Sequence, residues 1–268
     1  MTRVRVPASI ANMGPGFDVL AMAVDLWLDV DAEEADEPEW EFEGEGAEHL
    51  AEHPNPLSAL PMRGWVGSEI PLGVGLGSSA AARVAAAVLA GSEDPIGDAG
   101  RAEGHYDNVS AAVMGGVVAV VGDEVHGLPI PDLEVALFVA RTPVPTEEAR
   151  AVLPQQVDHA DAIFNAARVA ALVQILHTRE WPRLDVALED RLHQRYRLPL
   201  YPWVQAVMDA AREAGAYATA VAGAGPSAFA LCERRFGEDV ALAMEEAGGD
   251  RGYGLVTKVT RQGFDVRG

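Results

Sequence analysis

The alternation of hydrophobic and polar positions predicts a mixed succession of strands and helices. Short apolar or alternating runs, which are typical of strands, cover residues 4–6, 19–28, 116–121, 133–140, 217–221, 227–232 and 254–260. Apolar positions at helical spacing predict helices over residues 160–177, 203–214 and 238–247. Strands and helices arranged in two blocks indicate an α+β protein with a boundary near Pro131, which separates residues 1–131 from residues 132–268.

The segment from Pro71 to Ala80, PLGVGLGSSA, precedes an alanine-rich run that ends before Gly91. Alternating glycines followed by two serines predict a turn that opens a helix over residues 78–90. Glycine lets backbone N–H groups converge, and the first helical turn leaves its own N–H groups unpaired. The pattern thus predicts a phosphate site, whose charge must be neutralised by amides and a metal because no lysine follows the glycines. On the glycines alone, a helix simply capped by Ser78 is the alternative.

Other polar segments lie between the predicted strands. Residues 7–18, PASIANMGPGFD, form a turn rich in Gly and Pro that places Asn12 beside Asp18. Taken alone, these two side chains are most simply explained as bonding their own backbone. The prolines of residues 55–65 leave room only for a short helix, and residues 92–100 predict a linker.

Three further segments complete the pattern. Residues 103–109, EGHYDNV, precede a short helical stretch over residues 111–114. Residues 145–150 predict the opening of a helix, and residues 222–226, AGAGP, predict a second glycine loop between two short strands.

Composition and charge narrow the possible functions. A chain of 268 residues with 49% hydrophobic content can bury one large core or two medium ones, and its length favours two lobes. The net charge of −21 argues against a nucleic-acid partner, because phosphate-binding surfaces need a basic field. Twelve acidic residues lie between Asp29 and Glu52, which predicts a solvated strand pair and loop.

Targeting signals and the cysteine count indicate the cellular location and exclude an internal disulfide. The N-terminus has no charged-then-apolar leader and no apolar run is long enough to span a bilayer, so we expect a cytoplasmic protein without a membrane partner. The single cysteine, Cys232, excludes an internal disulfide. Its setting in FALC predicts a buried strand position and not a nucleophile.

Taken together, these segments resemble the homoserine kinase family of the GHMP kinase superfamily. Four motifs match in order over nearly the whole chain: the substrate motif, the phosphate loop, the third motif and the C-terminal glycine loop, at residues 7–18, 71–80, 103–108 and 223–227. The first motif, with residues 105–108, 146–150 and 196–197, points to the homoserine kinases. The resemblance implies a two-lobed GHMP kinase fold, with a ribosomal S5 domain 2-like, nucleotide-binding N-terminal lobe and a ferredoxin-like C-terminal lobe.

The resemblance also implies an activity: ATP-dependent phosphorylation of L-homoserine to O-phospho-L-homoserine in threonine biosynthesis, by a homodimer that uses Mg²⁺. Ser79 and Glu103 would hold the Mg²⁺ through a hydroxyl and a carboxylate, which suit a hard cation. The residues implied to bind the nucleotide are Asn55, Pro71, Leu72, Gly73, Val74, Gly75, Leu76, Gly77, Ser78, Ser79 and Ala80.

Homoserine is a zwitterion with a hydroxyl, so its site needs groups of both charges. By the resemblance, Asp18 with Asn12 would bind the ammonium, and Arg150 and Arg197 would bind the carboxylate, which a planar guanidinium can grip through both oxygens. The residues implied to position the hydroxyl are His105, Asn108 and Thr146. Asp107 and Asn108 join Ser79 and Glu103 as catalytic candidates, and the role of Asp107 stays open because a loose phosphoryl-transfer transition state demands little nucleophile activation.

Simpler interpretations and rival functions stand beside this assignment. Taken singly, either arginine fits a surface salt bridge and Glu103 fits a solvated carboxylate. The stretches from Ser78 to Glu103 and from Asn55 to Pro71 are shorter than is usual in the family. The rivals are another GHMP small-molecule kinase, such as one acting on mevalonate, and a catalytically silent relative that binds a metabolite and a protein partner. Mevalonate has no ammonium for Asp18, which argues against the first rival.

Overall fold

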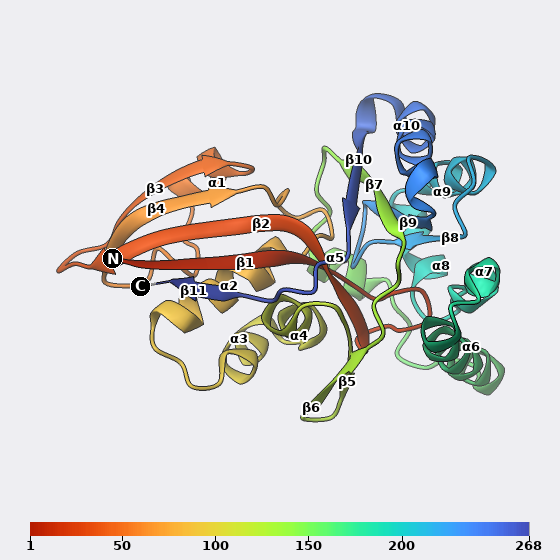
Figure 1. Cartoon of the computed structure of the whole chain (residues 1–268), viewed down its shortest axis with the longest axis horizontal. Coiled ribbons are helices and arrows are strands. Elements are labelled where there is room, and N and C mark those ends of the chain that lie inside the picture. The colour runs from red at the N-terminus through yellow and green to blue at the C-terminus, as the bar shows by residue number, and fades with distance from the viewer. Residues whose placement is uncertain (268) are drawn as a thin grey trace.

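The computed structural model describes residues 1–267 and contains two sheets with helices packed on each (Figure 1). The seven-stranded sheet has the order β11-β1-β2-β4-β3, with β5 paired to β2 and β6 paired to β5. Its strands are β1 (Thr2–Ala11), β2 (Leu20–Glu34), β3 (Glu39–Gly44), β4 (Met62–Ser68), β5 (Val117–Val121), β6 (Glu124–Leu128) and β11 (Asp265–Arg267). The four-stranded sheet, in the order β10-β7-β9-β8, comprises β7 (Glu134–Ala140), β8 (Ala218–Val221), β9 (Ala228–Cys232) and β10 (Gly252–Lys258). The predicted α+β class is confirmed.

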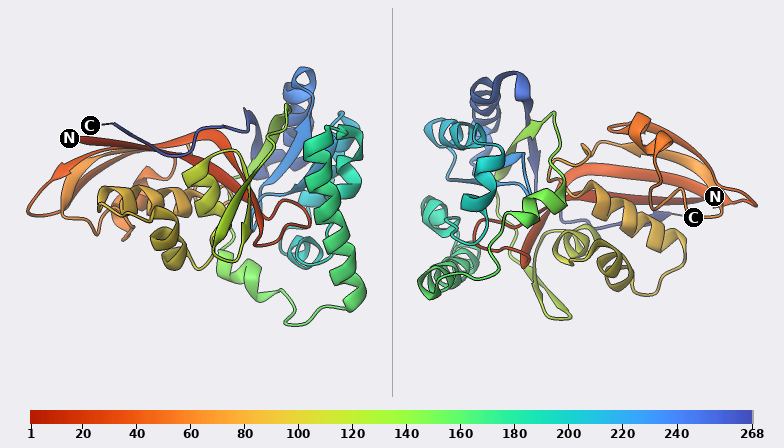
Figure 2. Two further views of the ribbon diagram at one scale, coloured as in Figure 1. Left: turned by 60° about the horizontal axis from the view of Figure 1, so that its bottom comes forward. Right: turned by 180° about the vertical axis from the view of Figure 1, so that it is seen from behind.

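Helices cover both sheets. On the first sheet lie α1 (Ala47–Glu52), α2 (Ser78–Leu89) and α4 (Asp107–Met114), and α3 (Pro95–Glu103) packs against α2 and α4. The later part of the chain contributes α5 (Thr146–Ala151), α6 (His159–Thr178), α7 (Leu184–Ala187), α8 (Gln194–Arg197), α9 (Val204–Glu213) and α10 (Gly237–Gly248). Helices α9 and α10 pack against each other and on the four-stranded sheet, while the long α6 lies at the outer edge of that half (Figure 2). No helix within residues 1–267 is both long and apolar enough to cross a membrane.

Small side chains let α2 lie closely on β1. The buried face of α2 is built from Ala80, Ala81, Val84 and Ala85, and alanine adds almost no thickness between a helix and a sheet. The backbone N–H of Ser9 on β1 donates to the carbonyl of Leu76 at 3.1 Å. The loop before α2 is therefore fixed to the central strand of the fold.

Two segments near the site differ from prediction. Strand β1 continues past Val6 to Ala11, because a register shift between Pro7 and Ala8 accommodates the proline without ending the pairing with β2. Most of the predicted linker at residues 92–100 is the start of α3. The side chain of Asp94 accepts from the N–H of Gly97 at 2.9 Å, and Pro95 occupies the first turn, where a missing N–H costs nothing.

The nucleotide-side segment also departs from prediction. No helix forms within residues 55–65, which make a turn and then enter β4, and the short helix α1 lies before them. On β3 the acidic residues alternate with Trp40 and Phe42: the glutamates are exposed and the rings are half-buried. The predicted solvated strand is therefore present in the acidic region, but β3 pairs with β4 and not with β2, and the end of the region forms α1 and not a loop. Cys232 is fully buried on β9, and burial raises the pKa of its thiol to about 11, as expected for a structural cysteine.

The two ends of the described chain meet on one sheet edge. Strand β11 pairs antiparallel with β1, so that Arg3 lies opposite Arg267, and the termini lie side by side in Figure 2. The chain enters the four-stranded sheet at Glu134, shortly after Pro131, and returns to the first sheet after β10, through a bridge between Val259 and Val24 and then through β11.

Candidate active site

The loop from Pro71 to Gly77 joins β4 to α2 and has the geometry of an anion site. Gly73, Gly75 and Gly77 have φ values of 69°, 93° and 72°, which L side chains rarely adopt. Gly77 is the N-cap residue of α2 and Ser78 is already helical, so the alternative in which Ser78 caps the helix is wrong. The first helical bond runs from Ala81 N–H to the Gly77 carbonyl. Within the described chain, the N–H groups of residues 78–80 have no partner and are available to a phosphate.

The second glycine loop, residues 222–226, packs directly against the first. Ser227 N–H donates to the carbonyl of Val74 at 3.3 Å, and Gly223 N–H donates to the carbonyl of Ala11 on β1 at 3.1 Å. A Cβ atom on Gly75 would lie 2.1 Å from the carbonyl oxygen of Ala222. The phosphate loop, the end of β1 and the C-terminal glycine loop thus meet at one point.

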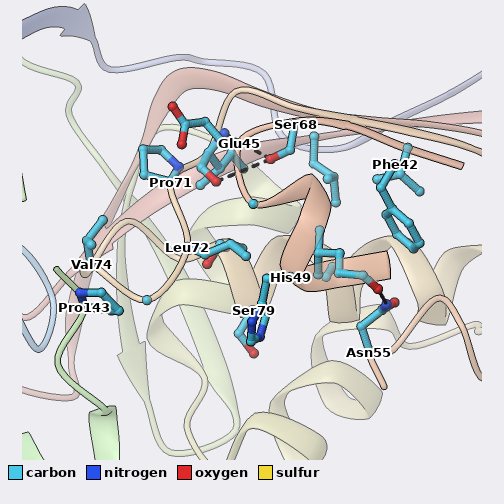
Figure 3. A pocket seen from close by; sticks show the side chains of 18 of the residues that line it. Phe42, Glu45, His49, Asn55, Ser68, Pro71, Leu72, Val74, Ser79 and Pro143 are labelled. Atoms are coloured by element: carbon cyan, nitrogen blue, oxygen red, sulfur yellow. Dashed lines mark hydrogen bonds between the residues drawn. The ribbon is translucent and has the colours of Figure 1, made fainter. Parts of the chain in front are cut away.

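A cavity of about 840 Å³ lies on one side of the phosphate loop (Figure 3). Phe42 and Asn55 lie at one end of the view, and Val74 and Pro143 lie at the other. The walls are mainly apolar where β3, α1 and β4 contribute, and the hydroxyls of Ser78 and Ser79 mark the polar end. Despite the short segments on this side, the chain retains a cavity of the size that a nucleotide needs.

Asn55 lines this cavity, but its polar atoms are used by the turn that follows α1. Its Nδ2 donates to the carbonyl of Leu50 at 3.0 Å, and its Oδ1 accepts from the N–H groups of Leu57 and Ser58 at 3.1 and 3.0 Å. The side chain therefore shapes the wall of the cavity, and contact with a base through Asn55 stays a prediction.

A smaller cavity of about 90 Å³ lies on the other side of the phosphate loop. Its lining brings together the catalytic candidate Asp107 and all of the residues predicted to bind the substrate or the metal, namely Asn12, Asp18, Ser79, Glu103, His105, Asn108, Thr146, Arg150 and Arg197. Gly73, Ser78 and Ser79 line both cavities. The phosphate loop is therefore the wall that the two cavities share.

The predicted metal ligands Ser79 and Glu103 are in contact. The hydroxyl of Ser79, in the first turn of α2, donates to Oε2 of Glu103, at the end of α3, over 2.8 Å. One hydroxyl and one carboxylate fit Mg²⁺, which usually keeps waters and takes the rest of its six ligands from phosphate oxygens. No group of three or more His, Cys, Asp or Glu within residues 1–267 could hold a metal alone, so this pair would depend on the nucleotide to complete the shell.

Arg83, which the sequence analysis did not single out, completes this cluster. Its Nε donates to the same Glu103 oxygen at 2.5 Å. Arg83 lies four residues after Ser79, one turn further along α2, and neighbours at this spacing share a helix face. The one sequence signal for a functional role of Arg83 was its position as a charged residue within the alanine-rich run.

The start of α4 places three predicted residues at the smaller cavity. Asp107 is buried, and its Oδ1 accepts from the N–H of Asn108 at 2.8 Å and from Nδ1–H of His105 at 2.9 Å. Ser9 donates its hydroxyl to Oδ1 of Asn108 at 2.9 Å. Within the described residues, Nδ2 of Asn108 and Oδ2 of Asp107 have no partner, so both are available to a ligand.

The His105–Asp107 contact predicts a pH dependence of stability. The bond to Asp107 raises the pKa of His105 above its ordinary value of 6.5, with further attraction from Glu103 and Asp18. A raised histidine pKa stabilises the fold below pH 6.5 and loses this contribution as the pH rises through the folded-state pKa. The difference in unfolding free energy between wild type and His105→Gln, measured by urea titration, should therefore be larger at pH 5.5 than at pH 9. Equal differences at both pH values would contradict this assignment.

The residues predicted to bind the two charged groups of the substrate are paired with each other. Arg150 donates from both Nη atoms to the two carboxylate oxygens of Asp18, each over 2.9 Å. Asn12 is committed to the fold, because its Nδ2 donates to the carbonyl of Gly223 at 3.0 Å and its Oδ1 accepts from Asp18 N–H at 2.9 Å. Thr146 begins α5 at the rim of the same cavity.

Arg197 is buried beside this pair, with 1% of its surface exposed. Its Nε donates to the carbonyl of Ala149 at 3.1 Å, and its Nη1 donates to the carbonyl of Gly223 at 3.1 Å. Burial lowers the pKa of Arg197. The Phe17 ring lies 5.2 Å from the guanidinium carbon of Arg197 and 5.5 Å from that of Arg150, so one aromatic ring holds both cations at the cavity.

His193 positions Arg197 and was missed by the sequence analysis. Its Nε2 donates to the carbonyl of Gly14 at 2.7 Å, which leaves Nδ1 to accept from Nη1 of Arg197 at 3.2 Å. Burial lowers the pKa of His193, consistent with a neutral ring that can accept this bond. The spacing of four residues between His193 and Arg197 at α8 was the only local signal.

Comparison with known proteins places this geometry in a family. A family model described as GHMP kinases C terminal matches residues 170–250. The chain is 40% identical to a homoserine kinase of Thermus thermophilus, over 96% of this chain and 95% of the relative. It is 38% identical to a homoserine kinase of Caldanaerobacter subterraneus, over 94% and 90% of the two chains.

Solved structures agree with the sequence relatives. The crystal structure of homoserine kinase from Cytophaga hutchinsonii is similar with a TM-score of 0.86 and 27% identity, covering 99% of this chain and 97% of that chain. A mevalonate kinase from L. major has a TM-score of 0.74 at 11% identity, which shows a shared fold alone. The fold, the phosphate loop between two cavities and these similarities lead to one conclusion: the chain belongs to the homoserine kinase family of the GHMP kinases.

Proposed function

We propose that this protein transfers the γ-phosphoryl group of ATP to the side-chain hydroxyl of L-homoserine, giving O-phospho-L-homoserine in threonine biosynthesis. The observation that carries the proposal is the position of the phosphate loop. Its serines and Gly73 line both the large, mainly apolar cavity and the small, charged cavity. A nucleotide in the first cavity would therefore point its phosphates at an acceptor in the second.

The small cavity has the charges that a zwitterion requires. Asp18 and Arg150 neutralise each other through two bonds of 2.9 Å. The ammonium of homoserine can replace the Arg150 contact on Asp18, while its carboxylate binds the freed guanidinium and Arg197. Because the incoming pair of charges replaces an existing pair, no charge at the site is left without a partner.

The α4 residues would position the acceptor hydroxyl. Asn108 and Asp107 each have an unpartnered polar atom and line the small cavity, and His105, which lines the same cavity, bonds the other oxygen of Asp107. A loose phosphoryl-transfer transition state needs alignment and charge neutralisation more than a strong base. Mg²⁺, held through Ser79 and Glu103, would neutralise charge on the phosphate oxygens. The free N–H groups of residues 78–80 would bind the same oxygens.

A panel of acceptors tests the proposal. Purified protein with ATP and Mg²⁺ should release ADP with L-homoserine, and little with mevalonate, shikimate or galactose. Release of ADP that depends on mevalonate and not on homoserine would favour the rival kinase. Failure to bind nucleotide, with the fold retained, would favour the catalytically silent relative.

Arg197→Ala should weaken homoserine binding much more than ATP binding. Charged hydrogen bonds contribute about 1.5–3 kcal/mol, which corresponds to roughly a 10- to 100-fold rise in the KM for homoserine. The KM for ATP should change less than about threefold, because Arg197 lines only the small cavity. Steady-state kinetics with each substrate varied in turn provides the measurement. Arg212→Ala, an exposed arginine paired with Asp185, is the control. If Arg197→Ala left both KM values unchanged, the carboxylate assignment would be wrong.

The proposed homodimer and its use of Mg²⁺ rest on the family resemblance, whereas the cellular location and the lack of nucleic-acid and membrane partners rest on the sequence and its net charge of −21. On that basis we propose a cytoplasmic homodimer that uses Mg²⁺ and has neither a nucleic-acid nor a membrane partner. Light scattering of the purified protein tests the oligomeric state directly.

A further inference from the structure

The ion pair between Arg83 and Glu103 connects the two cavities. Arg83 lines the large cavity and Glu103 lines the small one, while Ser79, which bonds Glu103, lines both. Arg83 uses only Nε for Glu103, over 2.5 Å. Within the described chain, its Nη1 and Nη2 have no partner, and 32% of the side chain is exposed. The guanidinium therefore presents two free donor groups at the polar end of the large cavity.

The charges around this end of the cavity are sparse. The only charged residues that line the large cavity within the described chain, apart from its histidine, are Glu45, Arg83 and Arg141. Arg141 follows β7 and lies near the ring of Tyr253, at 5.6 Å from its centroid. Arg83 instead lies one helical turn from Ser79 in the phosphate loop region. The phosphate loop itself has no lysine, and Arg83 is the cation of the large cavity that shares a helix with Ser78 and Ser79.

From this geometry we propose that Arg83 is a triphosphate-binding residue, a role that rests on the proposed nucleotide site. Arg83 neutralises Glu103 through Nε alone, and its free Nη1 and Nη2 bind phosphate oxygens of the nucleotide while that contact persists. Arginine suits this double role because the planar guanidinium has five N–H donors, enough for a carboxylate and a phosphate together. The residue replaces, from the helix, the positive charge that a lysine supplies in other phosphate loops.

A simpler role for Arg83 makes a different prediction. If Arg83 only holds Glu103 in place, its removal would affect nucleotide binding solely through the uncompensated negative charge of Glu103. That effect vanishes when Glu103 is replaced by glutamine. Direct contact with phosphate persists in the glutamine background, so a double-mutant cycle separates the two roles.

The test uses isothermal titration of the full chain with ATP, ADP and adenosine, in EDTA so that no metal contributes. The proteins are wild type, Arg83→Ala, Arg83→Lys, Glu103→Gln and the double variant Arg83→Ala with Glu103→Gln. Arg101→Ala is the matched control, because Arg101 is an exposed arginine on the adjacent α3 that pairs with Asp98 and lines neither cavity. Adenosine fills the large cavity without phosphates and reports whether each variant retains the folded site.

We expect Arg83→Ala to weaken metal-free ATP binding about tenfold, in both the wild-type and the Glu103→Gln backgrounds, and to leave adenosine binding unchanged. Arg83→Lys should retain part of the affinity, and Arg101→Ala should match wild type. A tenfold loss in the wild-type background that disappears with Glu103→Gln would overturn the proposal in favour of the simpler role. Unchanged ATP binding by Arg83→Ala would overturn it as well. If wild type bound neither ATP nor adenosine, the proposed function itself would fail, and this inference would fail with it.

Discussion

Glu103→Gln should lower kcat by about 100- to 1,000-fold at saturating homoserine and ATP, the cost of losing one charge-stabilising group at a reacting centre. Glutamine preserves the shape of the side chain and can still accept from Ser79, but it cannot balance the charge of a divalent cation. The KM for homoserine should change little, because Glu103 bonds Ser79 and Arg83 and not the residues proposed to bind the zwitterion. Steady-state assays of ADP release over a range of Mg²⁺ concentrations measure kcat and the KM for homoserine.

A glutamate elsewhere on the first sheet provides the matched control for this substitution. Glu124 lies on β6 with 78% of its side chain exposed, and Glu124→Gln should retain wild-type kinetics. A kcat for Glu103→Gln within threefold of wild type at saturating Mg²⁺ would remove Glu103 from the metal site.

Gly75→Ala should destabilise the fold by about 3 kcal/mol or more, through a left-handed backbone and a backbone clash together. The φ of Gly75 is 93°, and the added Cβ would lie 2.1 Å from the Ala222 carbonyl oxygen. Relief of this clash requires the two glycine loops to separate, so the variant should also lose ATP affinity. Urea unfolding and titration with ATP measure the two effects.

Gly91→Ala separates the two causes. Gly91 follows α2 with a φ of 78°, and a Cβ there would meet nothing within 4 Å. Its substitution should therefore cost only the backbone conformation, about 1–2 kcal/mol, and leave ATP binding intact. If Gly75→Ala were no less stable than Gly91→Ala, the contact between the loops would carry no energetic weight.

Local sequence signals were sufficient to predict those elements whose conformation depends mainly on residues adjacent in the chain. The phosphate loop and α2 could be predicted because glycine and alanine have strong conformational preferences of their own. The sequence pattern predicts a linker where α3 starts, although Asp94 and Pro95 form a standard helix opening. Gly97 and Gly100, which follow them, have low helix propensity. Those glycines are buried: a Cβ on Gly100 would lie 2.3 Å from the Tyr106 ring.

The contacts that build the site could not be predicted from sequence, because they join residues far apart in the chain. Asp18 and Arg150 are separated by 132 positions, and nothing in either segment indicates that they bond each other. The motif resemblance placed both residues at the substrate. The bond between them, and the hydrogen bond between His193 and Arg197, depend on how the loop after β1 packs against the later part of the chain. The roles of individual site residues, and the boundary near Pro131, remain predictions.

The meeting of the two glycine loops has a consequence for how the protein is made. Val74, in the first loop, accepts from Ser227, and Asn12 at the end of β1 donates to Gly223, across 211 positions. On the ribosome, the phosphate loop therefore lacks these contacts until most of the polypeptide has emerged. During that interval we expect ATP to stabilise the nascent chain less than the finished protein, since a ligand stabilises only the state that binds it. Early folding must then depend on the packing of α2 and its neighbours against the first sheet.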